Sequence, residues 1–537
     1  MDYKKLAEIL FPDIDKEPEY YENLYPKREG TITRLGPSPT GFIHLGNLYG
    51  AFTDERLAHL NQGTFYLRIE DTDDKRYVEG AVDVIIDSLD YFGIHFDEGV
   101  TKDGEKGDYG PYYQSARKEI YQTYAKSLVK QGKAYPCFMT EEEIAKLRGY
   151  QEKNKLDPGI YGIFAESRDL PMGEILVKLE KKEPYVIRLR SDEKDTEIEV
   201  ADGIRGTLKM PANKQDVVIL KKNGIPTYHF AHAVDDHLMR TTHVIRGAEW
   251  LSSLPIHYEL FDALGFELPI YCHTGQLMKI DENGNKRKLS KREDPELSLE
   301  YYRKAGYHKQ AVTEYIMTLL NSNYEEWREE NPDTDWREFP FTLEKMNPAG
   351  TLVDLDKLND VSKNTLVKIP SEELYDFLVE WADEFAPEYR ERLKDKDYWI
   401  KILNLDRTGD KPRKDLVNAP QIMEYTNYFF DYVKEDKYPD ECAYNTREIL
   451  KRYLESYDHS DDQSAWFDKI RAIAEDMGYA KRPKDYKKNP DDYKGHVGHV
   501  STVIRIALMG RASSPDVWEI QQIMGEEMTR ERIKAHI

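Results

Sequence analysis

The sequence predicts an α/β domain built on a parallel sheet, split by an α+β insertion and followed by an all-α region. Buried strand patterns alternate with helix patterns over residues 31–89, which is the order that right-handed crossovers require. Residues 133–215 are instead rich in charge and hold only short strand-like runs. Beyond about residue 346, apolar residues recur mainly at helical spacing.

The first half of the α/β domain contains two strand–helix pairs. Residues 31–35 form a short buried strand, and Gly and Pro mark the loop 36–41 (GPSPTG) that follows it. Apolar residues at helical spacing then begin a helix at His44. A second strand covers residues 64–69, and a second helix carries apolar residues on one face over 78–89. This order predicts that the strands run parallel.

The later segments continue the same domain after the insertion. Within the insertion, residues 185–190 are typical of a strand, and a Gly-punctuated segment follows. Residues 217–220 and 244–245 resume the buried strand pattern. Residues 323–338 are polar and contain tryptophan, which predicts a surface loop.

The composition predicts a multidomain protein of the cytoplasm. At 537 residues the chain is too long for one core, so roughly three to five domains are expected. No apolar run approaches the roughly 18 residues of a membrane span, and charges interrupt the N-terminal apolar stretch, so neither a span nor a secretory signal is expected. The net charge of −23 argues against a protein that coats nucleic acid, yet one local basic surface could still bind RNA.

The three cysteines support a reducing compartment. Cys137, Cys272 and Cys442 lie far apart and form neither a metal-ligand spacing nor a disulfide framework. We therefore predict no structural zinc and no other protein-bound metal site.

The first candidate site lies where a strand passes into a helix, at residues 34–47 (RLGPSPTGFIHLGN). Ligands of such sheets bind at the carboxyl ends of the strands, and the N–H groups at a helix start favour phosphate. His44 can donate to a phosphate there, and Gly46 leaves room for a planar base. The alternative is a Pro/Gly-rich loop in which His44 only caps the helix.

The second candidate site is the basic loop at residues 286–292 (KRKLSKR). Lys288 and Lys291, with Ser290 between them, can hold a polyphosphate whose charge shifts during displacement. The alternative is a solvated basic loop without a ligand.

Together, the two motifs resemble the "HIGH" and "KMSKS" signatures of class I aminoacyl-tRNA synthetases, here residues 44–47 (HLGN) and 288–292 (KLSKR). Other motifs narrow the resemblance to glutamyl-tRNA synthetases. They are GPSPTG at 36–41, RIEDTD at 68–73, GPYYQS at 110–115, PTYHFA at 226–231, VDDHLM at 234–239 and VIRGAEW at 244–250. The resemblance covers nearly the whole chain, except the first 30 residues and scattered insertions.

The resemblance implies a Rossmann-type catalytic domain split by a tRNA-acceptor insertion and followed by a helical anticodon-binding region. The implied divisions are an N-terminal extension (1–30), the two catalytic halves (31–132 and 216–265), the acceptor-binding insertion (133–215), a stem-contact region with the KLSKR loop (266–345) and the anticodon-binding domain (346–537).

The resemblance also implies roles for individual residues. The residues implied in catalysis are His44, Lys288 and Lys291. Those implied at ATP are His44, Gly46, Asn47, Glu249, Leu277 (through its backbone), Lys288, Ser290 and Lys291. Those implied around glutamate are Arg34, Gly36, Ser38, Glu70, Tyr228 and Arg246. Arg413 would read the anticodon, with a surface arginine as the alternative.

The function implied is that of a glutamate–tRNA ligase. It would activate L-glutamate with ATP and Mg²⁺ to glutamyl-adenylate and transfer the glutamate to the 3′ end of tRNA-Glu, working as a monomer. Charging of tRNA-Gln with glutamate is the alternative. The reaction needs no protein nucleophile, so catalysis would rest on positioning and charge stabilisation.

Several alternatives remain open for single residues. Glu70 could cap the helix that follows it, and Tyr228 could belong to the core. Asp235 and Asp236 could form a carboxylate pair for a metal, although we favour a structural turn.

Three other functions are also possible. A glutaminyl-tRNA synthetase conflicts with the loop 36–41 and with Arg246, which favours an anionic side chain. A short tRNA-modifying glutamyl transferase would lack residues beyond about 300. A non-catalytic RNA-binding paralogue would be expected to lose His44 or Lys291, and this chain keeps both.

Overall fold

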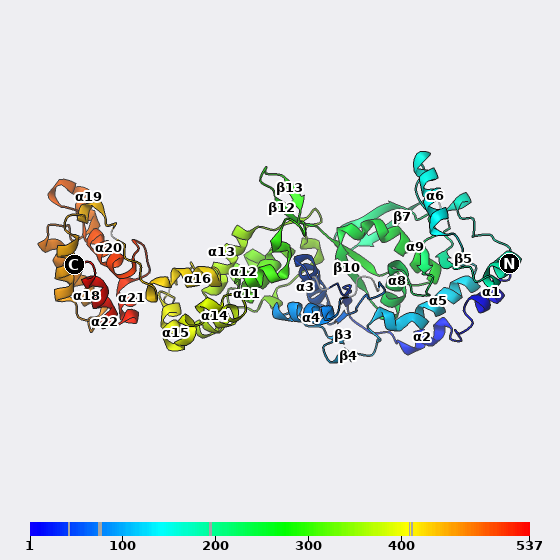
Figure 1. Ribbon diagram of the computed structural model, residues 1–537, viewed down its shortest axis with the longest axis horizontal. Coiled ribbons are helices and arrows are strands. Elements are labelled where there is room, and N and C mark those ends of the chain that lie inside the picture. The colour runs from blue at the N-terminus through cyan, green and yellow to red at the C-terminus, as the bar shows by residue number, and fades with distance from the viewer. Residues whose placement is uncertain (41–42, 74–77, 193–195, 408, 410–411, 436) are drawn as a thin grey trace. The chain divides into compact units, whose positions relative to one another are not determined.

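The computed structural model describes residues 1–40, 43–73, 78–192, 196–407, 409, 412–435 and 437–537, which fall into two compact units (Figure 1). The first unit comprises Met1–Tyr301 and Thr313–Asp354, and the second comprises Tyr302–Val312 and Leu355–Ile537. The domain divisions expected from the sequence remain predictions.

The first unit contains the parallel sheet that the strand–helix order predicts. Its strands, in spatial order, are β1 (Ile32–Leu35), β2 (Thr64–Leu67), β3 (Glu98–Thr101) and β4 (Gly104–Lys106). The first three run parallel, and β4 turns back on β3. The connections between the parallel strands contain α3 (Leu45–Leu60) and α4 (Ala81–Tyr91). Between α3 and β2, a Cβ on Gly63 would lie 1.8 Å from the Thr31 carbonyl oxygen, so only glycine fits there.

The second half of the α/β domain forms another four-stranded sheet. Its strands, in spatial order, are β10 (His243–Gly247), β11 (Ile270–Thr274), β7 (Glu197–Asp202) and β8 (Gly206–Pro211). β10, β11 and β7 run parallel, and β8 is antiparallel to β7. Two strands from residues 133–215 therefore extend the sheet that carries Arg246. The two sheets meet where the Thr242 N–H donates to the Ile32 carbonyl oxygen at 2.9 Å.

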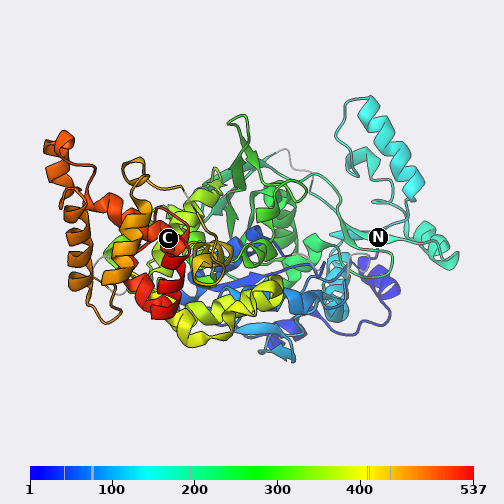
Figure 2. The same cartoon turned by 60° about the vertical axis from the view of Figure 1, so that its left-hand side comes forward.

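The rest of residues 133–215 forms an α+β element. β5 (Ala134–Cys137) and β6 (Val186–Leu189) pair antiparallel, and β6 pairs with β9 (Val218–Leu220), which follows the insertion. Two helices complete the element, α6 (Glu141–Lys153) and α7 (Met172–Glu180). In Figure 2, α6 stands out from the body of the unit as a cyan helix.

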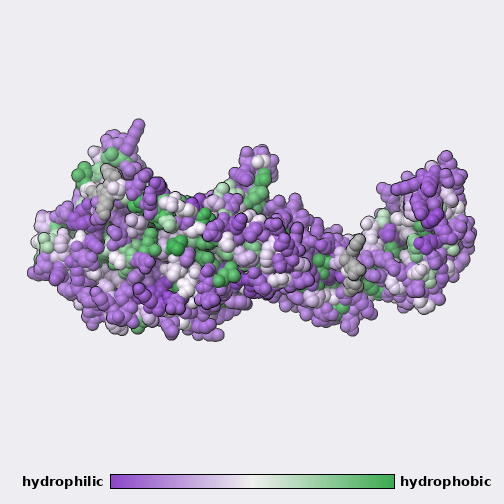
Figure 3. Space-filling view, turned by 180° about the vertical axis from the view of Figure 1, so that it is seen from behind, coloured by the Kyte–Doolittle hydropathy of each residue, from purple (hydrophilic) through white to green (hydrophobic). Residues whose placement is uncertain are grey.

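The surface of the first unit is mainly hydrophilic on the face shown in Figure 3. The hydrophobic side chains that reach this face gather between α6 and the hairpin of β12 (Leu277–Ile280) and β13 (Lys286–Lys288). This hairpin leads into the KLSKR loop.

One local prediction was wrong. Residues 323–338, expected as a surface loop, contain the helix α12 (Tyr324–Glu330). Tyr324 is buried, and the Glu314 carboxylate accepts from its hydroxyl at 2.6 Å and from Arg328 Nη2 at 2.7 Å. These contacts from outside the segment stabilise a helix too short to form alone.

The first 30 residues fold onto the first unit, and we call them the N-terminal arm. α1 (Tyr3–Leu10) packs against α5 (Lys118–Lys130), and α2 (Pro18–Leu24) also contacts α5. Buried arm side chains join the core of the unit, namely Leu6, Ala7, Leu10, Phe11, Ile14, Tyr21 and Tyr25.

The second unit is built from helices, as the sequence predicts. Its longer helices include α13 (Leu355–Leu366), α14 (Ser371–Phe385), α15 (Lys396–Asn404), α17 (Thr446–Ser456), α18 (Gln463–Asp476), α20 (Val497–Met509), α21 (Val517–Met524) and α22 (Glu526–Lys534). They enclose an aromatic-rich core in which the buried Trp399 ring stacks on Phe430. Across the described residues of both units, no helix is long and apolar enough to cross a membrane.

Candidate active site

The first unit has a cavity of about 790 Å³ at the carboxyl ends of β1, β2 and β10. All residues predicted to contact ATP or glutamate line this cavity except Ser290. They come from the end of β1 and the loop after it, the start of α3, the segment after β2, the start of α8 (Tyr228–Leu238), the end of β10 and the segment after it, the start of β12 and the KLSKR loop. Of the loop after β1, residues 41–42 lie outside the described residues.

His44 begins α3 and also faces the cavity. The Asn47 N–H donates to His44 Nδ1 at 3.2 Å, and the His44 N–H donates to Asn47 Oδ1 at 3.1 Å. Burial, reinforced by the charge of Lys291, lowers the pKa of His44 to about 4. The ring is therefore neutral near pH 7, and because Nδ1 accepts, its proton is on Nε2. His44 thus caps the helix and keeps a donor nitrogen.

Gly46 leaves room for the His44 ring. A Cβ on Gly46 would lie 3.0 Å from the ring, tighter than a usual contact. The same local structure occurs at the start of α20, where the Gly498 N–H donates to His496 Nδ1 at 3.0 Å. A Cβ on Gly498 would lie 2.7 Å from the His496 ring. His44 therefore does cap its helix, as the alternative for this motif holds. This role does not prevent His44 from also contacting a ligand.

A buried carboxylate shapes the KLSKR loop. Asp294 accepts from Arg287 Nη1 at 2.6 Å and Nη2 at 2.8 Å, and from the Ser290 N–H at 2.7 Å. Ser290 is therefore turned toward Asp294 and does not line the cavity, whereas Lys288 and Lys291 on either side of it do. The basic loop is ordered by a specific acidic partner, which a merely solvated loop would not need.

Leu277 and Glu249 line the cavity as well. The Leu277 carbonyl oxygen accepts from the Leu289 N–H at 3.1 Å, which joins β12 to the KLSKR loop. Glu249 folds back over Gly247, where an added Cβ would lie 2.3 Å from its carboxylate.

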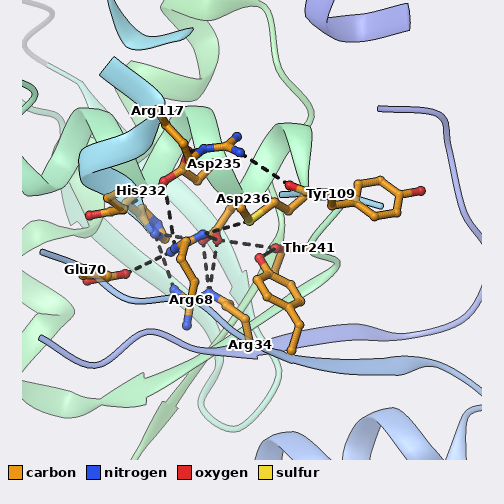
Figure 4. Close-up of polar contacts among 12 residues, drawn as sticks. Arg34, Arg68, Glu70, Tyr109, Arg117, His232, Asp235, Asp236 and Thr241 are labelled. Atoms are coloured by element: carbon orange, nitrogen blue, oxygen red, sulfur yellow. Dashed lines mark hydrogen bonds and ion pairs between the residues drawn. The ribbon is translucent and has the colours of Figure 1, made fainter. Parts of the chain in front are cut away.

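Arg34, near the end of β1, is held by a buried carboxylate of α8 (Figure 4). Asp236 accepts from Arg34 Nε at 3.2 Å, from Arg68 Nη1 at 2.6 Å and lies 2.8 Å from His232 Nδ1. Burial would raise the pKa of Asp236, but the two arginines hold it well below its ordinary value. Asp236 is therefore ionised and fixes both guanidinium groups beneath the cavity.

The neighbouring Asp235 is paired in the same way. It accepts from Arg117 Nε at 2.7 Å, Gln114 Nε2 at 2.9 Å and the Tyr121 hydroxyl at 2.7 Å. Both aspartates lie within α8, so the structural turn expected here is wrong. Buried arginine partners allow two consecutive carboxylates inside a helix. In the described part of the chain, no three His, Cys, Asp or Glu side chains are grouped to hold a metal.

Glu70 reaches the cavity beside Gly36. Arg68 Nη2 donates to Glu70 Oε1 at 3.0 Å, so Glu70 is linked to Asp236 through one arginine. A Cβ on Gly36 would lie 2.4 Å from Glu70 Oε1. Glycine at this position therefore makes room for the carboxylate. The alternative role for Glu70 as a helix cap is wrong, because the N-cap of α4 is Gly80.

Arg246, at the end of β10, is buried but held by two neutral rings. Arg246 Nε donates to His273 Nε2 at 2.9 Å, and Arg246 Nη1 donates to His257 Nδ1 at 2.9 Å. Arg246 Nη2 is buried and has no hydrogen-bond partner among the described residues. A buried guanidinium with an unpaired nitrogen in a cavity wall is suited to an anionic ligand.

The two rings are themselves held in one tautomer. Burial lowers the pKa of His257 well below its ordinary value and also lowers that of His273. Because each neutral ring accepts from Arg246, its other nitrogen carries the proton. His273 Nδ1 donates to Asp202 at 2.6 Å, and His257 Nε2 donates to His229 at 2.9 Å. Sequence reasoning found Arg246 but missed these supports, which no motif marks.

Tyr228 is partly buried and forms an aromatic wall. Its ring lies 4.6 Å from Trp250 and is stacked 5.9 Å from His232, measured between centroids. Tyr228 lines the cavity, so it does more than fill the core. Lys221, which sequence reasoning missed, also lines the cavity and donates to the Thr72 carbonyl oxygen at 3.0 Å.

Arg413 lies in the second unit. Its guanidinium lies 4.8 Å from the Tyr425 ring centroid and donates to Asp415 at 2.5 Å. Arg413 Nη1 is buried and has no hydrogen-bond partner within the described residues.

Comparison with known proteins identifies the family. Residues 31–330 match the family described as tRNA synthetases class I (E and Q), catalytic domain, and residues 490–537 match an anticodon binding domain. A glutamate–tRNA ligase from Acetivibrio thermocellus is 61% identical, covering 99% of this chain and 100% of the relative. The chain belongs to the glutamyl-tRNA synthetases. A glutamate–tRNA ligase from Clostridium perfringens is 47% identical over the full length of both chains.

Solved structures of the synthetase family share the fold. A glutamate tRNA ligase from Elizabethkingia meningosepticum, solved in complex with its amino acid, is 28% identical with a TM-score of 0.78 over 95% of this chain and 99% of that one. A glutamate-tRNA synthetase from Elizabethkingia anophelis is 29% identical with a TM-score of 0.77 over 95% and 100%. These matches confirm the predicted class I catalytic fold, the helical anticodon-binding region and the enzyme class.

Proposed function

We propose that the chain is a glutamate–tRNA ligase that charges tRNA-Glu with L-glutamate at the expense of ATP. Arg246 carries the proposal. It is buried, its visible hydrogen-bond partners are neutral histidines, and one of its nitrogens is unpaired among the described residues. A γ-carboxylate would satisfy this nitrogen, whereas the amide NH₂ of glutamine would bring a donor against a donor.

The rest of the glutamate site would follow from the network around Arg34. Its guanidinium, oriented by Asp236, also lines the cavity and would add positive potential there. The Glu70 carboxylate lines the cavity, and one of its oxygens accepts from Arg68. Glu70 would therefore also accept from the substrate ammonium. Gly36 and Ser38 would bring the loop backbone close to the amino acid, and Tyr228 would close one wall.

The nucleotide would lie between α3 and the KLSKR loop. Class I synthetases use ATP, and the start of α3 offers N–H groups to phosphate. His44 Nε2–H would donate to the phosphates, and Lys288 and Lys291 would neutralise them, with Asn47 keeping the His44 ring in place. Gly46, Glu249 and the Leu277 backbone would border the adenosine, and Ser290 would act indirectly by shaping the loop.

Mg²⁺, which is general for the family, would enter with the nucleotide. Mg²⁺ is commonly held through substrate phosphates and water rather than by a protein cage. The ion would offset phosphate charge.

The chemistry would proceed in two displacements. An α-carboxylate oxygen of glutamate attacks the α-phosphorus of ATP, the bond to the β-phosphate oxygen breaks, and pyrophosphate leaves. A terminal ribose hydroxyl of tRNA then attacks the activated carbonyl carbon, and AMP leaves. His44, Lys288 and Lys291 would stabilise the charge that develops on the phosphates, while Arg34 and Arg246 hold the amino acid in line.

Residues 133–215 would contact the acceptor end, and the helical C-terminal region would contact the anticodon. Arg413 would read an anticodon base, because a guanidinium can contact base edges specifically. Replacing Arg413 with glutamine should then change the preference between tRNA-Glu and tRNA-Gln. An unchanged preference would leave Arg413 with its packing role on Tyr425. A monomer in the cytoplasm, expected from the sequence, completes the proposal.

The direct test is aminoacylation by the purified full-length chain. With ATP, Mg²⁺ and labelled glutamate we expect charged tRNA-Glu, with tRNA-Gln measured in parallel and glutamine as the alternative amino acid. His44→Ala and Lys291→Ala should remain folded and lose charging. A folded wild-type protein that binds tRNA without charging it would instead support the non-catalytic paralogue.

A further inference from the structure

The N-terminal arm is fastened to the end of α8, next to the aspartates beneath the cavity. Glu22 of α2 accepts from the Tyr124 hydroxyl at 2.9 Å, from His237 Nε2 at 2.7 Å and from Arg240 Nη2 at 3.1 Å. His237 lies in the last turn of α8, and Arg240 follows the helix. One carboxylate of the arm therefore joins α5 to the C-terminal end of α8.

Arg240 occupies a backbone position that favours glycine. Its φ is +60°, in the left-handed region that commonly ends helices and strains residues with a Cβ. Its guanidinium reaches back to the arm and donates to the Tyr25 carbonyl oxygen from Nε at 3.1 Å and to the Glu22 carbonyl oxygen at 3.3 Å. The contacts with the arm explain why an arginine stands at this position.

The backbone of Arg240 closes the turn that contains Asp236. The Arg240 N–H donates to the His237 carbonyl oxygen at 3.1 Å, and the Thr241 N–H donates to the Asp236 carbonyl oxygen at 2.8 Å. These two bonds form a Schellman motif, the usual closure of a helix by a left-handed residue. The Thr241 hydroxyl also donates to Asp236 Oδ1 at 3.4 Å. A shift of Arg240 would therefore move Asp236.

A second contact of the arm acts on the same turn. Arg28 Nη2 donates to the Met239 carbonyl oxygen at 2.8 Å, and Arg28 Nη1 donates to Glu98 at 2.9 Å. The arm thus binds the backbone of the α8 end from one side and the Arg240 side chain from another.

We propose that the N-terminal arm positions the amino-acid site. Through Glu22 and Arg240 it holds the helix end that carries Asp236. Asp236 in turn orients Arg34 and, through Arg68, Glu70. Glu22 and Arg240 are then positioning residues, and they contact no substrate. The inference rests on the proposed glutamate–tRNA ligase activity.

The ionisation of Glu22 supports this arrangement. Burial opposes its charge, but the hydrogen bond from His237 and the other donors lower the pKa of Glu22 to about 2. Glu22 is therefore a carboxylate at neutral pH and attracts Arg240.

Two variants and one matched control separate positioning from simple stabilisation. Glu22→Gln removes the charge that holds Arg240. Arg240→Gly removes the side chain but suits the left-handed backbone, so it should change the melting temperature little. Glu17→Gln is the control, because Glu17 joins the same arm to Lys130 of α5 at 2.5 Å without touching α8.

In aminoacylation with full-length protein, Glu22→Gln and Arg240→Gly should raise the glutamate KM by about fivefold to tenfold, while the ATP KM stays within about twofold. Glu17→Gln should leave both KM values at the wild-type level. If both variants keep the wild-type glutamate KM, whatever their melting temperatures, the inference is wrong. If Glu22→Gln does not fold, Arg240→Gly decides alone. Failure of the wild-type protein to charge tRNA-Glu would overturn the proposed function instead.

Discussion

Replacing Arg246 with alanine removes the guanidinium proposed to select glutamate. Arg246 carries five N–H donors, of which one goes to His273 and one to His257. The remaining donors include those on Nη2, which has no partner among the described residues. Two of them can pair with a carboxylate in a bidentate fork.

The magnitude follows from these two bonds. A hydrogen bond to a charged group contributes about 1.5–3 kcal/mol, so two contribute about 3–6 kcal/mol. The variant should therefore lose roughly 10²- to 10⁴-fold in kcat/KM for glutamate. The loss should appear mainly in the glutamate KM, and the advantage of glutamate over glutamine should shrink. The ATP KM should change little, because the proposal assigns Arg246 to the amino acid and not to the nucleotide.

The assay is aminoacylation of tRNA-Glu with glutamate varied at saturating ATP, and then with ATP varied at saturating glutamate. Arg188→Ala is a matched control. Arg188 is also a buried arginine of a strand, but it lies in β6 and donates to the Asp216 carbonyl oxygen. The control should lower the melting temperature without raising the glutamate KM. Unaltered glutamate kinetics in Arg246→Ala would refute the assignment, and a loss confined to ATP would place Arg246 at the nucleotide.

Three further predictions concern other parts of the molecule. Gly36→Ala should raise the glutamate KM about tenfold with little effect on ATP, because its Cβ would lie 2.4 Å from Glu70 Oε1 and overpacking typically costs about 1–3 kcal/mol; an unchanged glutamate KM would show that Glu70 can move freely. The free energy of unfolding should fall as the pH drops from 6.5 toward 4, because in that range the His44 side chain takes up a proton only in the unfolded state. Thermal melts of the wild type and of His44→Gln at both ends of this pH range measure the effect. The same pH dependence of the melting temperature in both proteins would contradict it. Protein purified without added zinc should contain much less than one zinc per chain, because Cys137 lies buried in β5 without a grouped set of ligands in the described residues; a stoichiometric, tightly held zinc in metal analysis would prove the prediction wrong.

The sequence predicted the elements whose pattern is local. Residues 31–35 and 64–69 showed strand patterns on either side of a helix, and the structure pairs these segments in parallel. The KLSKR loop and the loop after β1 were identified by motif, and both line one cavity. The binding of ATP and glutamate by these lining residues stays a prediction.

The sequence could not reveal features that depend on distant partners. Residues 197–202 lie within the predicted insertion, and the structure forms them into β7, which pairs with β11; such a pairing leaves no mark in either strand. Asp235 and Asp236 were expected in a structural turn, because the family resemblance assigns this segment to shaping the site, and the structure places both in a helix. Their partners Arg117, Arg34 and Arg68 come from three other segments, so the compensation is visible only in three dimensions.

The repeated histidine cap at α3 and α20 bears on how such chains are recognised. The motifs His44-x-Gly46 and His496-x-Gly498 each begin a helix with a histidine cap. In each, the glycine lacks the Cβ that would crowd the histidine ring. A search scored on these few letters alone would find three hits in this one chain, because residues 273–275 (HTG) have the same spacing although they start no helix. The residues around the two histidine caps differ. Lys288 and Lys291 line the same cavity as His44, whereas His496 lies beside His499 and the aromatic ring of Tyr486. The diagnostic unit of such a signature is thus the helix start together with the charges opposite it.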